Sequence, residues 1–169
     1  MSLIQSSFIM YIRRTEKKDL LEIENIYALA KQFMRDSGNP NQWKGEYPNA
    51  FDAEEDIKNG TGNVVVENDE VVGVFAFCVG EEKTYNVIYN GSWLNDKPYA
   101  FIHRIAVKYH GMGIVDFCFS ECFKQFSNLR IDTHEDNIPM QKVLKRNGFI
   151  FCGEIYLENG EKRLAYQKI

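Results

Sequence analysis

The sequence predicts an α/β protein in which a mixed β-sheet carries helices on both faces. Three observations lead to this fold class. Apolar residues recur at helical spacing near the N-terminus, two alternating strands form a hairpin in the middle, and a strand, a glycine turn, a helix and a further strand follow in the second half. At 169 residues the chain fits one domain that buries close to ~70% of its unfolded surface. We find no repeat and no interdomain linker.

The first half of the chain alternates strands and helices. Residues 1–9 precede a second methionine and are expected to be an N-terminal extension or a cloning leader, so the single domain spans residues 10–169. The predicted elements are a strand at 11–14, a long helix that Thr15 caps and that ends near 37–40, an aromatic-rich loop, a short helix at 53–58, hairpin strands at 64–66 and 71–79, and a strand at 85–89.

The second half has the stronger pattern. The predicted elements are a strand at 101–107, a helix at 114–126, a strand at 129–133, a short helix from Asn137 to 147–149, and strands at 151–156 and 163–167 joined at 159–160. Together the elements form a mixed sheet with helices on both faces.

Composition narrows the function classes. The net charge of -4 and the pI near 5.5 argue against a nucleic-acid binder, whose binding face would be basic. The short apolar run at 8–12 is far below the length of a membrane span, so we expect no membrane partner. Cysteines 78, 118, 122 and 152 are too few and too dispersed for a disulfide framework, which indicates the reducing cytoplasm. Cys118 and Cys122 lie four apart, but no second pair completes a metal site, so no metal is expected.

A glycine turn joins the 101–107 strand to the following helix. Its sequence is His110-Gly111-Met112-Gly113. Two missing Cβ atoms let the backbone turn sharply and let amide N–H groups approach a ligand. The free donors of a helix N-terminus suit an anion such as pyrophosphate. The alternative is a plain tight turn, because the chain has neither a P-loop nor the three-glycine dinucleotide motif.

The ordered set Ile105-Ala106-Val107, His110-Gly111-Met112-Gly113, Asn137 and Gly148-Phe149 resembles the GNAT superfamily of acyl-CoA N-acyltransferases. The resemblance covers most of the chain. It implies a mostly antiparallel sheet of about seven strands, acetyl-CoA as the cofactor, and pairing of the pantetheine arm with the 105–107 strand edge. Lys108 would add a charge near the pyrophosphate, and Asn137 would bond the pantetheine as well as cap its helix. The implied cofactor-binding residues are Ile105, Ala106, Val107, Lys108, His110, Gly111, Met112, Gly113, Ile114, Val115 and Asn137.

Three positions depart from the family pattern. His110 stands where Gln or Arg is usual, and Val115 stands where Gly or Ala is usual; both leave a backbone cradle intact. Leu144 occupies the position of the tyrosine that often protonates the leaving thiolate. Water, Tyr109 or another phenol would then take that role. Because general acid assistance is worth about 10²-fold to 10⁴-fold, its loss slows transfer without abolishing it.

Two histidines are the catalytic candidates, ahead of Asp132 and Glu135. Strand alternation places His103 on the face of Phe101 and Ile105, near where several family members carry a catalytic glutamate. An imidazole pKa near ~6.5 suits a base at neutral pH. His134 ranks second and would be oriented by Asp132. The alternative for His103 is a hydrogen-bonded histidine within a core strand.

The resemblance implies an N-acetyltransferase that moves the acetyl group of acetyl-CoA to a primary amine of a small molecule or peptide, by direct attack in a ternary complex. The alternatives are a non-catalytic CoA- or acyl-CoA-binding regulatory module and an interaction domain with purely structural glycines. The aromatic loop after the first helix, with Trp43 and Tyr47, would bind the acceptor or merely pin the loop to the core. A late hairpin of this family often pairs with a second subunit, so a homodimer is expected.

Overall fold

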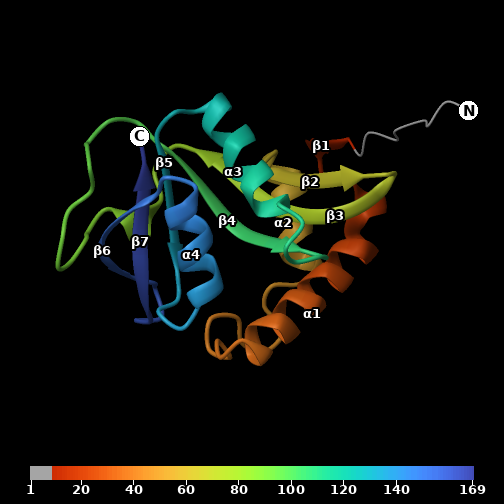
Figure 1. The fold of residues 1–169 in the computed structure, drawn as a ribbon, viewed down its shortest axis with the longest axis horizontal. Helices are drawn as coiled ribbons and strands as arrows, with labels where there is room; N and C mark the ends of the chain where they lie inside the picture. Colours follow the sequence, from red (N-terminus) through yellow and green to blue (C-terminus); the bar gives the residue numbers. More distant parts are fainter. Residues whose placement is uncertain (1–8) are drawn as a thin grey trace, which may run out of the picture.

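Seven strands form one sheet in the order β1-β2-β3-β4-β5-β7-β6, with β4 and β5 as its parallel pair and antiparallel pairing elsewhere (Figure 1). The computed structural model describes residues 9–169, so the expected leader at 1–9 lies almost wholly outside the described residues. The strands are β1 Met10–Arg14, β2 Gly62–Glu67, β3 Glu70–Val79, β4 Ala100–Val107, β5 Leu129–Thr133, β6 Ile150–Tyr156 and β7 Lys162–Lys168. The sequence-based prediction of a mixed, mostly antiparallel sheet is confirmed.

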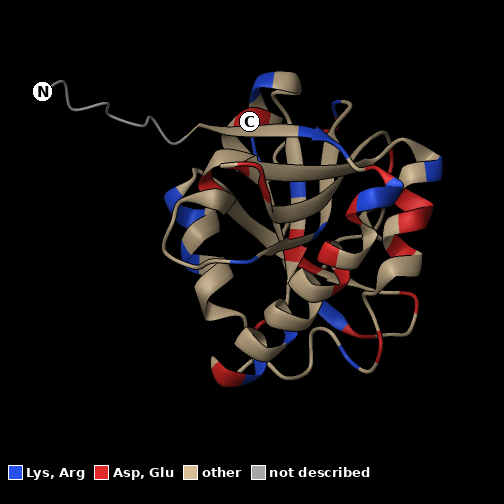
Figure 2. Cartoon of the chain, turned by 90° about the vertical axis from the view of Figure 1, so that its right-hand side faces the viewer, with Lys and Arg blue, Asp and Glu red and all other residues tan. Residues whose placement is uncertain are grey.

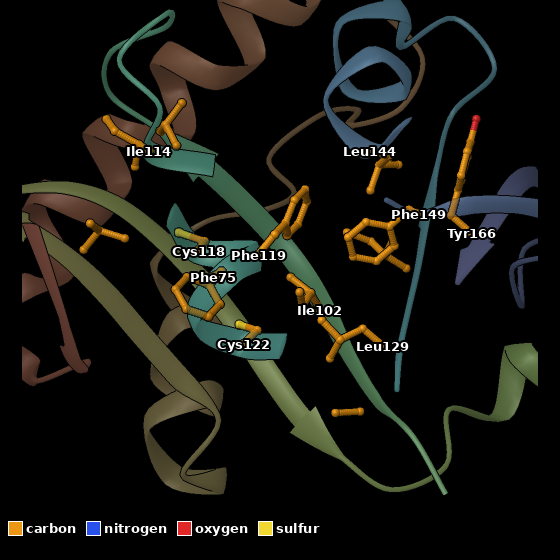
Figure 3. Close-up of a cluster of buried hydrophobic side chains, with 14 of the residues drawn as sticks. Phe75, Ile102, Ile114, Cys118, Phe119, Cys122, Leu129, Leu144, Phe149 and Tyr166 are labelled. Carbon is orange, nitrogen blue, oxygen red and sulfur yellow. The ribbon is translucent and has the colours of Figure 1, made fainter. Parts of the chain in front are cut away.

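Helices cover both faces of this sheet, as predicted. They are α1 Leu20–Asp36, α2 Ala50–Asn59, α3 Ile114–Gln125 and α4 Ile138–Arg146, with short 3-10 helices η1 Lys17–Asp19 and η2 Lys83–Tyr85. Apolar residues of α1 and α2 pack on one face, and those of α3 and α4 pack on the other, where Figure 3 shows Phe119 beside Phe149. Cys118 and Cys122 lie inside this second cluster, and burial raises the pKa of the Cys122 thiol to about 12.

The segment between β3 and β4 differs from the prediction. A strand at 85–89 was wrong, because the chain forms η2 there and Tyr89 makes only an isolated bridge to Glu154. Tyr85 is 1% exposed and anchors the segment against Tyr99 and Phe101. Beyond it, a Cβ at Gly91 would lie 1.9 Å from the Cys152 carbonyl oxygen, so the backbone passes close to β6 at a point where only glycine fits.

The start of the first helix also differs. Thr15 is not the cap; its backbone N–H donates to the Gly62 carbonyl at the start of β2, and Glu16 is the N-cap. Glu16 and Asp19 instead form a capping box around η1, and α1 begins at Leu20. The short helix predicted at 53–58 extends from Ala50, where the Asn49 side chain caps it.

Charged residues of both signs are interspersed over the elements seen in Figure 2. Among the described residues no helix is long and apolar enough to cross a membrane. Nor do His, Cys, Asp and Glu gather in threes within residues 9–169 at a spacing that would hold a metal ion.

Candidate active site

Strands β4 and β5 separate soon after they meet. Their parallel pairing covers Ala100 with Leu129 and Phe101 with Arg130, after which the strands diverge, as Figure 1 shows. On the other side of β4 a bulge interrupts the pairing with β3. Backbone N–H and C=O groups of β4 near this point therefore face an opening, and unpaired backbone groups need partners.

The bulge corrects the predicted arrangement of β4. Arg104 adopts a φ of 51°, and together with Ile105 it lies opposite a single residue of β3. Alternation is thereby broken: Phe101 and His103 share one face, with ring centroids 4.9 Å apart, whereas Ile105 packs with the cluster beneath α3 and α4. The sequence pattern placed all three on one face because it assumed a regular strand.

Three adjoining cavities run along this opening, with volumes of about 500, 90 and 370 Å³. Val107, His110, Val115 and Val143 line both the first and the second, while Met34, Ile105, Asn137 and Met140 line both the second and the third. The cavities thus form one groove from the glycine turn, past the edge of β4, to a wider chamber. We call that chamber, of about 370 Å³, the acceptor cavity.

The glycine turn forms the first end of the groove. Gly111 and Gly113 have φ values of 74° and 73°, and a Cβ on either would meet no heavy atom within 4 Å. Gly113 is the N-cap of the twelve-residue α3, and no side chain caps the helix. Free amides therefore face the cavity, where an anion suits them. Met112, Ile114 and Val115 also line this end.

Of two side chains near the glycine turn, His110 lines the groove and Lys108 does not. The His110 ring stacks on Phe33, with centroids 3.6 Å apart, and burial lowers its pKa. Lys108 lies away from the groove, because its Nζ pairs with Glu22 at 2.9 Å and Glu70 at 2.6 Å. The added pyrophosphate charge expected of Lys108 has no support in this geometry.

The middle of the groove runs beside α4. Ile105, Ala106 and Val107 line it from β4, as the sequence predicted for the strand edge. Asn137 lines it from the N-terminus of α4, where its Oδ1 accepts the Met140 amide at 3.1 Å. Its Nδ2 donates to Gln42 Oε1 at 2.8 Å. The predicted N-cap role is confirmed, and the residue also faces the groove.

His103 lines the acceptor cavity together with a carboxylate that sequence reasoning missed. Its Nε2 lies 3.0 Å from Glu82 Oε2. This hydrogen bond lowers the pKa of Glu82 to about 2, and the Thr84 amide adds to the effect. Glu82 is therefore ionised at neutral pH and places a negative charge beside the His103 ring. No motif marks Glu82, because it lies in irregular chain 21 residues before its partner.

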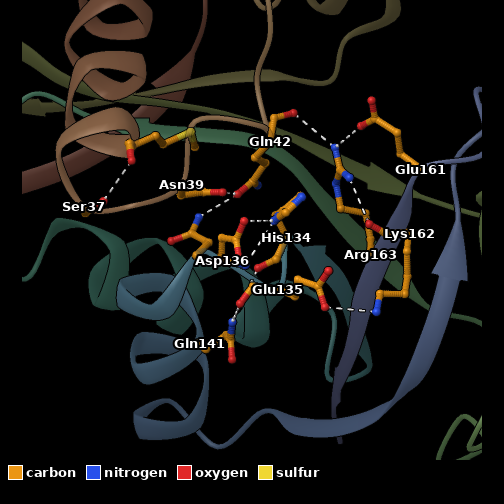
Figure 4. A network of polar contacts seen from close by, with 12 residues as sticks. Ser37, Asn39, Gln42, His134, Glu135, Asp136, Gln141, Glu161, Lys162 and Arg163 are labelled. Carbon is orange, nitrogen blue, oxygen red and sulfur yellow. Dashed lines mark hydrogen bonds and ion pairs between the residues drawn. The ribbon is translucent and has the colours of Figure 1, made fainter.

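Asp132 also lines the cavity, with its Oδ2 accepting the Tyr85 hydroxyl at 2.7 Å. The expectation that Asp132 orients His134 was therefore wrong. His134 instead uses Nδ1 to accept the Asp136 amide at 3.0 Å, in the polar network of Figure 4, and it lines none of the three cavities. The His134 ring therefore bonds within the turn before α4 and does not face the cavity.

The two aromatic residues predicted to contact the acceptor, Trp43 and Tyr47, both line the cavity. Trp43 also packs edge-on against Tyr27, at 6.0 Å between centroids. Gln42 fixes this loop, since its backbone carbonyl accepts from Arg163 and its side chain accepts from Asn39 and Asn137 (Figure 4). The loop is thus both pinned to its surroundings and exposed to the chamber.

Phenols near the site are few. Leu144, at the position of the family's tyrosine, is 0% exposed and belongs to the core. Tyr109 donates its hydroxyl to Glu70 at 2.8 Å and does not line the acceptor cavity. Among residues 9–169, Tyr47 is the tyrosine that lines this cavity.

Comparison with protein-family models and with curated protein sequences finds no match. Solved structures do match. A GNAT-family acetyltransferase from Streptococcus agalactiae is 33% identical with a TM-score of 0.87, over 95% of each chain. Arabidopsis thaliana Naa50 in complex with the bisubstrate analogue CoA-Ac-MVNAL is 15% identical, with a TM-score of 0.61 over 95% of this chain and 98% of that one. The aminoglycoside N-acetyltransferase AAC(6')-Iy in complex with CoA is 18% identical, with a TM-score of 0.63 over 92% and 97%. The last two likenesses show a shared fold.

Proposed function

Because this chain belongs to the GNAT family of acetyltransferases, we propose that it transfers the acetyl group of acetyl-CoA to a primary amine of a small molecule or peptide, by direct attack in a ternary complex. The observation that carries the proposal is the continuous groove from the glycine turn to the cavity holding His103 and Glu82. It brings an anion-binding helix end and a base to opposite ends of one path.

The cofactor end fits CoA. Amides of residues 110–115 would hold the pyrophosphate, because Gly113 opens α3 without a side-chain cap and Gly111 leaves open space beside the turn. The backbone edge of Ile105 to Val107 and the side chain of Asn137 would hold the pantetheine arm. When bound, acetyl-CoA supplies the thioester whose acetyl group is transferred.

The acceptor end supplies a base. His103 would take the proton that the substrate ammonium must lose before its nitrogen can attack, and ionised Glu82 would stabilise the resulting imidazolium. A backbone N–H at the β4 bulge would bind the carbonyl oxygen as negative charge grows on it, which is worth about 10²-fold to 10³-fold per donor. Tyr47, as the phenol of this cavity, would give a proton to the leaving thiolate.

The buried Leu144 favours the second candidate, a CoA-binding regulatory module without catalysis. Two measurements separate the candidates. Acetyl-CoA at about a hundredfold above its dissociation constant should stabilise the protein by roughly 2.7 kcal/mol. For a chain of this length that raises the unfolding temperature by about 5 to 10 °C.

Thiol release from acetyl-CoA, measured with a panel of primary amines, then tests transfer. Release with at least one amine establishes the enzyme, and stabilisation without release from any amine favours the module. Absence of any thermal shift contradicts both. The homodimer expected from the late hairpin stays a prediction, which sedimentation of the full chain tests.

A further inference from the structure

The acceptor cavity has a surplus of negative charge. Three basic side chains line it, and each has an acidic partner: His103 with Glu82, Arg104 with Asp56, and Arg163 with Glu161, which also pairs with Lys44 outside the cavity lining. Two further carboxylates line it, those of Asp132 and Glu158. Within residues 9–169 neither forms an ion pair with Lys, Arg or His. Two carboxylates that line the chamber therefore have no basic side chain paired with them.

Asp132 is held in place for a ligand. It lies on β5, half-buried, and the hydroxyl of the fully buried Tyr85 fixes one of its oxygens. An ionised carboxylate has about four acceptor sites, so this single bond leaves most of its capacity unused. A bound cation could use these remaining acceptor sites as its partners.

A second polar group beside it also lacks a partner. Thr133, the last residue of β5, is 1% exposed and lines the acceptor cavity, and its Oγ1 has no hydrogen-bond partner among the described residues. Buried hydroxyls are nearly always paired, so this hydroxyl at the cavity wall is available to bond a group that enters the cavity. A hydroxyl oxygen can accept from an ammonium.

Much of the rest of the cavity wall is apolar and aromatic, with Met34, Trp43, Ile102, Met140 and Leu157 among its residues. Such walls suit a chain of methylene groups, and Trp43 and Tyr47 suit a passing cation. The volume of about 370 Å³ lies near the lower end for small-molecule sites.

Resting on the acetyl transfer proposed above, we propose that the acceptor is an aliphatic amine with a second cationic group, that is, a diamine or short polyamine. The reacting nitrogen lies at His103, and the second ammonium lies at Asp132, with Glu158 in the same cavity lining. Monoamines, which have no second charge, would satisfy only one end of the chamber.

Calorimetric titration of the full chain, with and without saturating CoA, tests this with three probes. The probes 1,4-diaminobutane, 1-aminobutane and 4-aminobutanoate share a reacting ammonium and differ at the far end in charge, which is positive, absent or negative. We expect the diamine to bind about 10-fold to 100-fold more tightly than 1-aminobutane, as a charge-assisted hydrogen bond implies. We expect 4-aminobutanoate to bind more weakly than both. Equal affinities, or the opposite order, overturn the proposal.

Two variants locate the second ammonium. Asp132→Asn keeps an acceptor for Tyr85 but removes the charge, so the ratio of diamine to monoamine affinity should fall at least about fivefold. Glu158→Gln, on an exposed residue, should reduce the ratio less and does not threaten folding. The matched control is Glu135→Gln, because Glu135 pairs with Lys162 outside the cavity, and its ratio should match that of the wild type. An unchanged ratio in both test variants contradicts the assignment.

Failure of this inference can be told from failure of the proposed function. Thiol release that is equally fast with mono- and diamines contradicts the second-cation site but supports acetyl transfer. Preferential binding of the diamine without thiol release supports the second-cation site but contradicts acetyl transfer. In both cases the calorimetric titration still shows which of the three probes binds most tightly.

Discussion

The two ends of the groove present different kinds of groups to a ligand, backbone amides at one end and side chains at the other. At the glycine turn, the groups that face the ligand are backbone amides of one continuous stretch, residues 110–115. At the acceptor cavity, they are side chains from the loop after α1, the segment before β4, strands β4 and β5, and the final hairpin. One end depends on local conformation, and the other depends on the assembly of distant segments.

This difference determines how each end responds to change. Backbone amides carry fixed partial charges that do not titrate and that no side-chain substitution removes directly. The acceptor end instead contains ionisable pairs such as His103 with Glu82, so substitution and pH act on it directly. Disruption of the turn should therefore alter affinity for CoA, whereas disruption of the acceptor cavity should alter turnover.

The largest expected effect is on turnover. His103→Ala removes the proposed base, so kcat/KM for amine acetylation should fall by about 10²-fold to 10⁴-fold. The affinity for acetyl-CoA should stay within about twofold, because His103 does not line the middle or first cavity. Steady-state thiol release and a direct CoA titration measure the two quantities separately.

His134→Ala is the matched control, because His134 faces the turn before α4. Its kcat/KM should remain close to that of the wild type. If His134→Ala were as slow as His103→Ala, or if His103→Ala kept the wild-type pH-rate profile, the assignment of the base would be wrong.

The next effect is on cofactor affinity. Gly113→Asp places a carboxylate at the N-terminus of α3, beside the proposed pyrophosphate position. The residue has a φ of 73°, a region that Asp tolerates better than most residues do. Repulsion between like charges should weaken CoA binding by about tenfold to a hundredfold. Titration with CoA, or the loss of thermal stabilisation by acetyl-CoA, measures it.

Two variants distinguish charge at the turn from general strain. Gly160→Asp makes the same change at a φ of 85° in the final hairpin, far from the turn, and should leave CoA affinity intact. Lys108→Ala removes a cation that pairs with Glu22 and Glu70, and should change the affinity less than twofold. A large loss in Lys108→Ala would show that side-chain charge, not the backbone, dominates this end.

The same contrast explains which features the sequence could predict. The β2–β3 hairpin, α3 and α4 follow from periodicity and from local signals such as Asn137 at a helix start. The glycine turn was predictable for the same reason. The strand predicted at 85–89 was wrong because Tyr85 ends η2 and is buried against Tyr99 and Phe101, and this packing overrides local β propensity.

At the acceptor end, the sequence identified His103, Trp43 and Tyr47 as candidates, but it gave no sign of Glu82 or of the bulge at Arg104. Partners far apart in sequence leave no spacing signal. Lys108 illustrates the opposite error. Its proximity in sequence to the turn suggested a phosphate contact, but its ammonium forms ion pairs with Glu22 of α1 and Glu70 of β3 instead.

The smallest expected effect is the contribution of Glu82 to stability. His103 lowers the pKa of Glu82 from 4.5 to about 2 on folding. A carboxyl with a depressed folded-state pKa stabilises the fold above its unfolded pKa, and that stabilisation disappears as the pH falls from about 4.5 towards 2. Because the pair is partly open to solvent, we expect about 1 kcal/mol. In urea unfolding, Glu82→Gln should therefore have a lower free energy of unfolding than the wild type at pH 6. The difference between the two free energies should be smaller at pH 3.5. Glu81→Gln, at the exposed neighbouring residue, should show no such narrowing. A gap in Glu82→Gln that stayed constant over this range would mean that the carboxylate does not stabilise the folded acceptor cavity through its charge.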